Sequence, residues 1–85
     1  MTLTVLLFAK ARELAGSDLA TLELPDGSTV SDLRRALSDR IPALAPLLAA
    51  SMIAVNQELA AESQVLTAAD ELAVIPPVSG GTASS

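Results

Sequence analysis

The sequence predicts an α+β fold, with one main helix packed on one face of a mixed sheet of four to five strands. Three observations support this prediction. Short apolar stretches with the alternation or continuity of β-strands occur in both halves of the chain. A single long amphipathic stretch with helical periodicity lies between them. The 85 residues suit one domain.

The N-terminal part predicts two strands that form a hairpin-like pair. Residues 2–9 alternate and then become continuously apolar, which is typical of a central strand. Residues 10–15 favour a short helix, and Gly16 suits the position just after a helix end. Residues 19–24 favour the second strand.

The main helix is expected after a Pro-Asp-Gly-Ser turn. Thr29 can cap this helix, and Asp32 three residues later resembles a weak capping box. The apolar face of the helix contains Val30, Leu33, Ala36 and Leu37. Pro42 and Pro46 then end regular helix and frame a loop or short helical turns.

The second half predicts the remaining strands. Asn56 and Gln57 form a likely turn type for a chain reversal, with Asn56 closing it through its own side chain. The expected strands, of which the second lies in an ambiguous region, are residues 52–55, 64–66 and 71–75. This order of elements is that of a ubiquitin-like β-grasp. We expect a β-grasp domain over residues 1–77 and a flexible tail over residues 78–85.

Composition excludes several classes of function. The chain has no His and no Cys, so the usual zinc sites, a Cys nucleophile and a Ser-His-Asp triad are excluded. Ten acidic against five basic residues give a net charge of −5, which argues against nucleic-acid binding. No apolar run could span a membrane, and no signal peptide is apparent. We therefore expect a cytoplasmic protein without a metal site.

Three stretches carry a resemblance to a known family. Phe8–Gly16 reads FAKARELAG, Ala54–Gln57 reads AVNQ, and Leu66–Gly81 ends in PPVSGG. Together they resemble the small, sulfur-carrier subunits of molybdopterin synthase (the MoaD type), in the same order and over almost the whole chain. The resemblance implies a β-grasp carrier in molybdenum cofactor biosynthesis, with a thiocarboxylate on its C-terminal glycine, here Gly81.

The resemblance also implies partners that supply the catalytic side chains. A carboxylate is a poor electrophile, and the family activates it with ATP on a separate ubiquitin-activating-like adenylyltransferase. The large subunit then uses the sulfur on the pterin precursor, in an assembly of two small and two large subunits. This chain would bind no cofactor itself and would be a non-catalytic subunit of a sulfurtransferase.

The residues before Gly81 suit a tail that enters a partner's active site. Two prolines stiffen its base, and glycine leaves room in a narrow channel. The tail-insertion residues are Pro76, Pro77, Val78, Ser79 and Gly80. The family resemblance places interface residues among Phe8, Arg12, Leu59, Val74 and Ile75. From the residues alone, Phe8 favours the core, Arg12 favours a solvated helix surface, and the other three could be core.

The sequence departs from the family after Gly81, where Thr82-Ala83-Ser84-Ser85 follows. Because a thiocarboxylate needs a free carboxylate, a carrier with this extension would be blocked. Three explanations stay open: a protease removes residues 82–85, the four residues come from gene prediction or cloning, or the carrier role has been lost. We favour the protease.

Two further functions stay open. The chain could carry sulfur for thiamine or cysteine synthesis, since carriers of those pathways share the fold and the Gly-Gly end. It could also be a ubiquitin-like protein modifier or interaction module, which predicts conjugates on target lysines.

Overall fold

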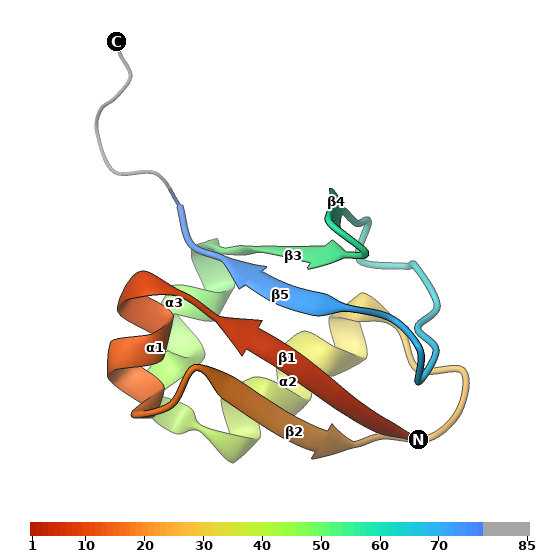
Figure 1. Cartoon of the computed structure of the whole chain (residues 1–85), viewed down its shortest axis with the longest axis horizontal. Coiled ribbons are helices and arrows are strands. Elements are labelled where there is room, and N and C mark those ends of the chain that lie inside the picture. Colours follow the sequence, from red (N-terminus) through yellow and green to blue (C-terminus); the bar gives the residue numbers. More distant parts are fainter. Residues whose placement is uncertain (78–85) are drawn as a thin grey trace, which may run out of the picture.

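A computed structural model describes residues 1–77 of the chain. A five-stranded sheet has the order β2-β1-β5-β3-β4, and the helices lie against one of its faces (Figure 1). β1 and β5 are parallel, while the other neighbouring strands are antiparallel. This arrangement confirms the predicted α+β class. The elements are β1 (Thr2–Leu7), α1 (Ala9–Ala15), β2 (Leu19–Glu23), α2 (Val30–Arg40), a 3₁₀ turn η1 (Pro42–Leu44), α3 (Ala45–Ala50), β3 (Met52–Val55), β4 (Glu58–Leu59) and β5 (Leu72–Ile75).

The central strand β1 is shorter than the predicted 2–9. Leu3, Val5 and Leu7 are buried on the face that the helices cover, as alternation requires. The strand ends because Phe8 is the N-cap of α1, and Ala9 takes a positive φ of 48° at the start of that helix. The predicted C-terminal glycine of α1 is confirmed, since Gly16 adopts the left-handed conformation and donates to Arg12 O.

Helix α2 begins with the predicted capping box. Asp32 N donates to Thr29 Oγ1 at 3.3 Å, and Thr29 N donates to Asp32 Oδ2 at 2.9 Å. The bond from the Thr29 backbone is the main reason why the pKa of Asp32 lies below its usual value. The helix thus starts at a fixed residue, which directs its apolar face to the sheet.

Arg34 of α2 connects three segments. Its guanidinium donates to Glu62 in the loop after β4, to Ser51 O at 2.8 Å and to Leu48 O. The last two carbonyls lie at the C-terminal end of α3 and just beyond it, so Arg34 closes this helix end. The predicted short helical turns around Pro42 and Pro46 are confirmed as η1 and α3.

The predicted strand over residues 64–66 is wrong. The fifth strand is β4, which pairs with β3 across the two-residue turn Asn56-Gln57. Residues 64–66 leave the sheet and run beside the start of α2 instead, where Val65 forms a single bridge with Thr29. Backbone bonds from Val30 N to Gln64 O and from Leu66 N to Ser28 O satisfy this segment.

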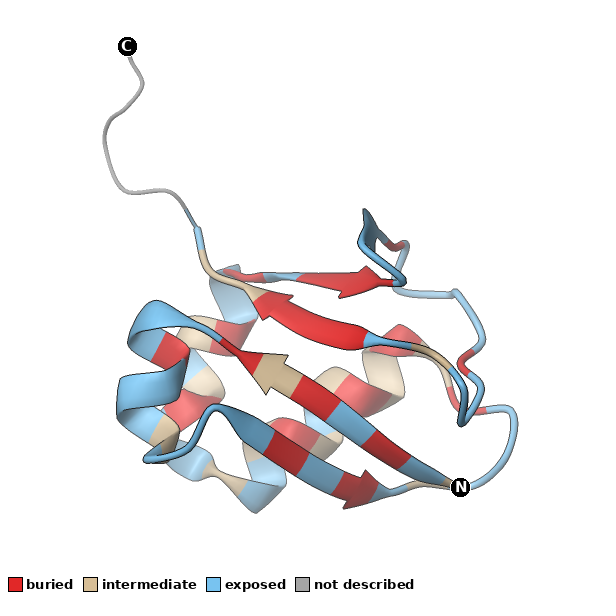
Figure 2. Cartoon of the chain, in the orientation of Figure 1, coloured by how far each residue is buried: buried red, intermediate tan, exposed pale blue. Residues whose placement is uncertain are grey.

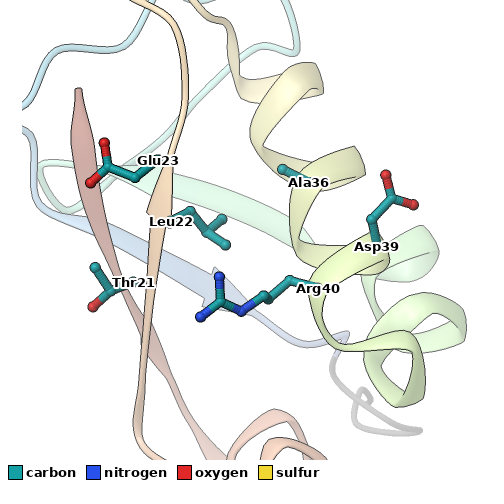
Figure 3. Close-up of a pocket in the computed structure, with 6 residues that line it drawn as sticks. All are labelled: Thr21, Leu22, Glu23, Ala36, Asp39 and Arg40. Carbon is teal, nitrogen blue, oxygen red and sulfur yellow. The ribbon is translucent and has the colours of Figure 1, made fainter.

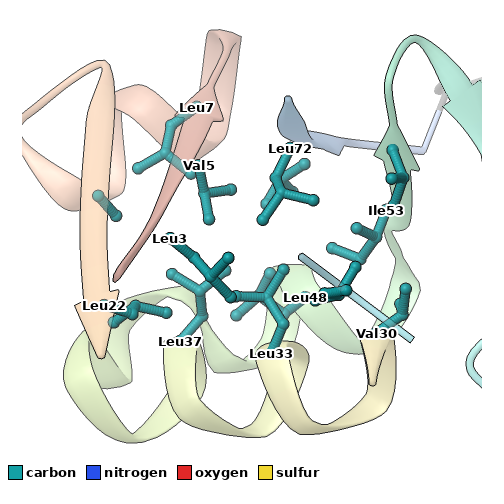
Figure 4. Packing of buried hydrophobic residues seen from close by; sticks show 14 of the residues in the cluster. Leu3, Val5, Leu7, Leu22, Val30, Leu33, Leu37, Leu48, Ile53 and Leu72 are labelled. Atoms are coloured by element: carbon teal, nitrogen blue, oxygen red, sulfur yellow. The ribbon is translucent and has the colours of Figure 1, made fainter. Parts of the chain in front are cut away.

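The core lies between the sheet and the helices (Figure 2). Leu33 and Leu37 of α2 point toward Leu3 of β1, and Leu72 of β5 joins them from the middle of the sheet (Figure 4). These side chains are almost completely buried, which anchors α2 beneath the centre of the sheet. No helix within residues 1–77 is long and apolar enough to cross a membrane.

Candidate functional site

The sheet face opposite the helices carries an apolar row that crosses four strands. Leu59 pairs with Ala54, Ala54 with Ala73, and Ala73 with Leu6. Residues directly opposite one another in a sheet point to the same face, so these four side chains lie side by side. No helix among the described elements covers this outer face (Figure 1). We call this surface the outer apolar face, with Phe8 and Ile75 as its further members.

The outer apolar face is hollowed in its middle. The hollow has a volume of about 300 Å³ and is bordered by Leu6, Phe8, Ala54, Leu59, Ala73 and Ile75, with Gln57 and Glu71 as its polar members. The two alanines form the floor between larger side chains, which explains the depression. A small apolar hollow that faces solvent can receive a side chain from another protein.

Three of the predicted interface residues meet on this face. Leu59 is 63% exposed and Phe8 is 46% exposed, while Ile75 is half-buried. The core interpretation of Phe8 from the sequence is therefore wrong: Phe8 follows Leu7 and points to the opposite side of the sheet. The contact with a partner that we expect for these three residues stays a prediction.

The other two predicted interface residues lie elsewhere. Val74 is 0% exposed and belongs to the core, because it points to the helices while its neighbour Ile75 points outward. This removes Val74 from the predicted interface. Arg12 is exposed on α1 and does not border the hollow.

Sequence reasoning missed the residues that build the floor of the hollow. Ala54 and Ala73 carry no chemical signal of their own, and Leu6 reads as one more residue of an apolar strand. Only the strand register brings them into one row. The alternation of Leu6 with the buried Val5 and Leu7 is the one signal that could have placed it outside.

One end of the outer apolar face is held by Asn56. Asn56 N donates to Glu71 O at 2.7 Å, and Asn56 Oδ1 accepts from Glu71 N at 2.9 Å. Asn56 Nδ2 also donates to Asp70 Oδ1 at 3.1 Å. The side chain thus ties the β3–β4 turn to the start of β5, rather than closing its own turn as the sequence suggests.

Backbone strain gathers at the same face. Within residues 1–77, the non-glycine residues with positive φ are Ala9 (48°), Asn56 (53°) and Gln57 (71°). Ala9 directly follows Phe8, and Gln57 borders the hollow. Left-handed conformations cost free energy for residues with a side chain and concentrate at functional sites.

The opposite end of the face leads to the predicted tail. Strand β5 ends at Ile75, which borders the hollow, and the half-buried Pro76 and the exposed Pro77 follow. The predicted positions Val78, Ser79, Gly80 and Gly81 lie outside the described residues. Any segment that continues from Pro77 therefore starts beside the outer apolar face.

The larger hollow of the molecule lies elsewhere. It measures about 600 Å³ and opens between β2 and α2, where Arg40 and Asp39 of the helix face Leu22 of the strand (Figure 3). Strand β1 separates β2 from β5, so this hollow is remote from Ile75. Within residues 1–77 there is also no group of three acidic, His or Cys residues that could hold a metal ion. We therefore take the outer apolar face as the candidate site.

Comparisons with known proteins agree with this choice of site. The profile of the ThiS family matches residues 5–81. The molybdopterin synthase sulfur carrier subunit of Escherichia coli (strain K12) is 48% identical over 80 residues, which are 91% of this chain and 96% of that protein. The protein of the same name from Arabidopsis thaliana is 43% identical over 77 residues, which are 91% and 80% of the two chains. The crystal structure of SAMP1 from Haloferax volcanii matches with a TM-score of 0.84 and 34% identity, over 95% of this chain and 100% of that chain.

Proposed function

Since the chain belongs to the ThiS family, whose profile spans residues 5–81, we propose that it is the sulfur carrier subunit of a molybdopterin synthase. Relatives of that name share 43–48% of its residues over 91% of its length. In this role a thiocarboxylate on Gly81 donates sulfur to the pterin precursor in molybdenum cofactor biosynthesis. The observation that carries the proposal is the outer apolar face, which ends where the chain runs on toward Gly81.

The chemistry requires partners, because this chain has no His or Cys. A carboxylate oxygen of Gly81 attacks the α-phosphate of ATP on an adenylyltransferase, and pyrophosphate leaves. A sulfur nucleophile then displaces AMP from the acyl adenylate, which yields the thiocarboxylate. When the sulfur passes to the pterin precursor and water enters at the acyl carbon, the carboxylate is regenerated. Both steps use a free Gly81 carboxylate and no side chain of the carrier.

The large subunit of the synthase is the partner that we assign to the outer apolar face. Leu59, Phe8 and Ile75 would bury their exposed surface there, and the hollow over Ala54 and Ala73 would receive an apolar side chain. The adenylyltransferase would dock on the same face in turn, because it needs the same access to Gly81. We expect this exchange to take place in the cytoplasm.

The carrier form would end at Gly81. The match to the family also ends at this residue, whereas Thr82 follows it in the sequence. We therefore propose that a protease removes the residues beyond Gly81. The intact mass of protein from its native cell tests this step, and an unprocessed, unsulfurated chain in cells that make the cofactor would contradict it.

The full proposal is tested by reconstitution. The chain ending at Gly81 is incubated with the cognate adenylyltransferase, ATP and a sulfide source. We expect a mass increase that corresponds to one sulfur in place of one oxygen, followed by its loss when the large subunit and the pterin precursor are added. The full-length chain is the matched control, and equal sulfuration of it would overturn the assignment of Gly81.

A second candidate function is protein modification. The similarity to SAMP1, a small archaeal modifier protein, favours it, because 95% of this chain matches that structure. This function predicts covalent conjugates between Gly81 and lysines of other proteins. A ladder of conjugates that disappears when the chain is truncated before Gly81 would support it.

A further inference from the structure

The turn between β3 and β4 contains two residues with different uses. Asn56 spends its backbone and side chain on Glu71 and Asp70. Gln57, the next residue, makes no side-chain hydrogen bond within the described part of the chain, and it is exposed. The turn therefore needs Asn56 for its structure and does not need the amide of Gln57.

Gln57 also occupies a position that disfavours its side chain. The consecutive φ values of 53° and 71° belong to a two-residue hairpin turn with left-handed backbone at both central positions. Glycine is the preferred residue at the second of these positions, since it has no Cβ. The sequence thus accepts a conformational cost to keep a glutamine there.

The location of Gln57 suggests what the cost supports. Its side chain borders the hollow of the outer apolar face, next to Glu71, at the end remote from Pro76. The row from Leu59 to Leu6 is apolar and offers no direction to a bound partner. A polar group at one end of an apolar contact fixes the orientation of the two proteins.

We propose that the Gln57 side-chain amide is a positioning residue of the carrier: it hydrogen-bonds the large subunit at the edge of the outer apolar face and thereby sets the direction in which the tail leaves. This inference rests on the proposed function. An amide supplies one acceptor and two donors, so it can bind a backbone segment or a polar side chain of the partner. The apolar row supplies the burial, and Gln57 selects the orientation.

The test combines stability with affinity for the large subunit, using the chain that ends at Gly81. Gln57→Gly should raise Tm by about 2–5 °C, because it relieves the left-handed strain. The same change should raise the Kd for the large subunit roughly tenfold, because a partner group loses its hydrogen bond. A purely structural glutamine would give no loss of affinity in a more stable protein.

Two further variants complete the test. Gln57→Asn keeps an amide and tolerates the left-handed backbone, so it should recover part of the affinity. Gln64→Ala removes the other glutamine, whose exposed side chain does not border the hollow, and should leave Kd unchanged. Wild-type affinity in Gln57→Gly would overturn this inference alone. Failure of the wild-type chain to bind the large subunit would overturn the proposed function, and the inference with it.

Discussion

Asn56 and Glu71 bind each other twice, through the bonds from Asn56 N to Glu71 O and from Glu71 N to Asn56 Oδ1. The two residues are 15 positions apart in the sequence, and their contact fixes the β3–β4 turn against the first residue of β5. This contact holds one end of the outer apolar face. It also explains why an asparagine occurs at a position with φ of 53°.

Asn56→Ala should destabilise the protein by about 1–2 kcal/mol, because it removes two side-chain hydrogen bonds and places alanine in a left-handed conformation. Asn56→Gly removes the same bonds without the backbone strain and should cost less. Urea denaturation of both variants measures the difference. Equal stability of Asn56→Ala and the wild type would show that the contact with Glu71 does not support the fold.

Stability should fall in acid because the pKa values of three carboxyl groups are lowered in the folded state. The side-chain bond from Arg34 lowers the pKa of Glu62, and the backbone bond from Thr67 lowers that of Asp70, as Thr29 does for Asp32. Above their ordinary pKa values of 3.8 and 4.5 these groups contribute their full stability. As the pH falls below this range, the unfolded chain binds protons first, so the contribution is lost.

The acid effect can be measured by urea denaturation between pH 7 and pH 3, with Glu62→Gln as the comparison. This variant should lose less stability on acidification than the wild type, since glutamine does not titrate. An identical pH dependence would show that the bond between Arg34 and Glu62 contributes nothing to it.

Leu59→Glu should weaken binding to the large subunit about 30-fold or more, because it places a charge in the apolar contact. Leu59 is exposed, so the free energy of unfolding should change by less than about 0.5 kcal/mol. Val65→Glu is the matched control, since Val65 is similarly exposed but lies outside the outer apolar face. Equal losses of affinity in the two variants would contradict the assignment of the face.

Gly81→Ala, in a chain that ends at this position, should leave the unfolding transition unchanged, because the core is built by residues 3–74. Sulfuration by the adenylyltransferase should slow roughly tenfold or more, since the added methyl group crowds the channel around the reacting carbon. Mass spectrometry over time measures both the substrate and the product. A normal rate would show that passage of the tail does not require glycine.

Much of the fold could be read from the sequence, because local chemistry specifies it. The capping box at Thr29 and Asp32 and the glycine after α1 involve only neighbouring residues. The apolar face of α2 follows from its period of 3.6 residues. The missing His and Cys showed independently that catalytic side chains must come from partners. The strand over residues 64–66 failed because its partner is the start of α2, which no local pattern reveals.

The outer apolar face was decided by the tertiary structure. Strand β5 reads Leu-Ala-Val-Ile, so every position is apolar and alternation cannot tell its two faces apart. Pairing with β1 and β3 sets the parity that buries Val74 and turns Ile75 outward. The same register brings Leu59, 53 positions away, into one row with Leu6 (59 − 6 = 53). Sequence thus determined which residues could contact a partner, and long-range strand pairing, which shifts every side chain to the other face when it slips by one residue, determined which of them do so together.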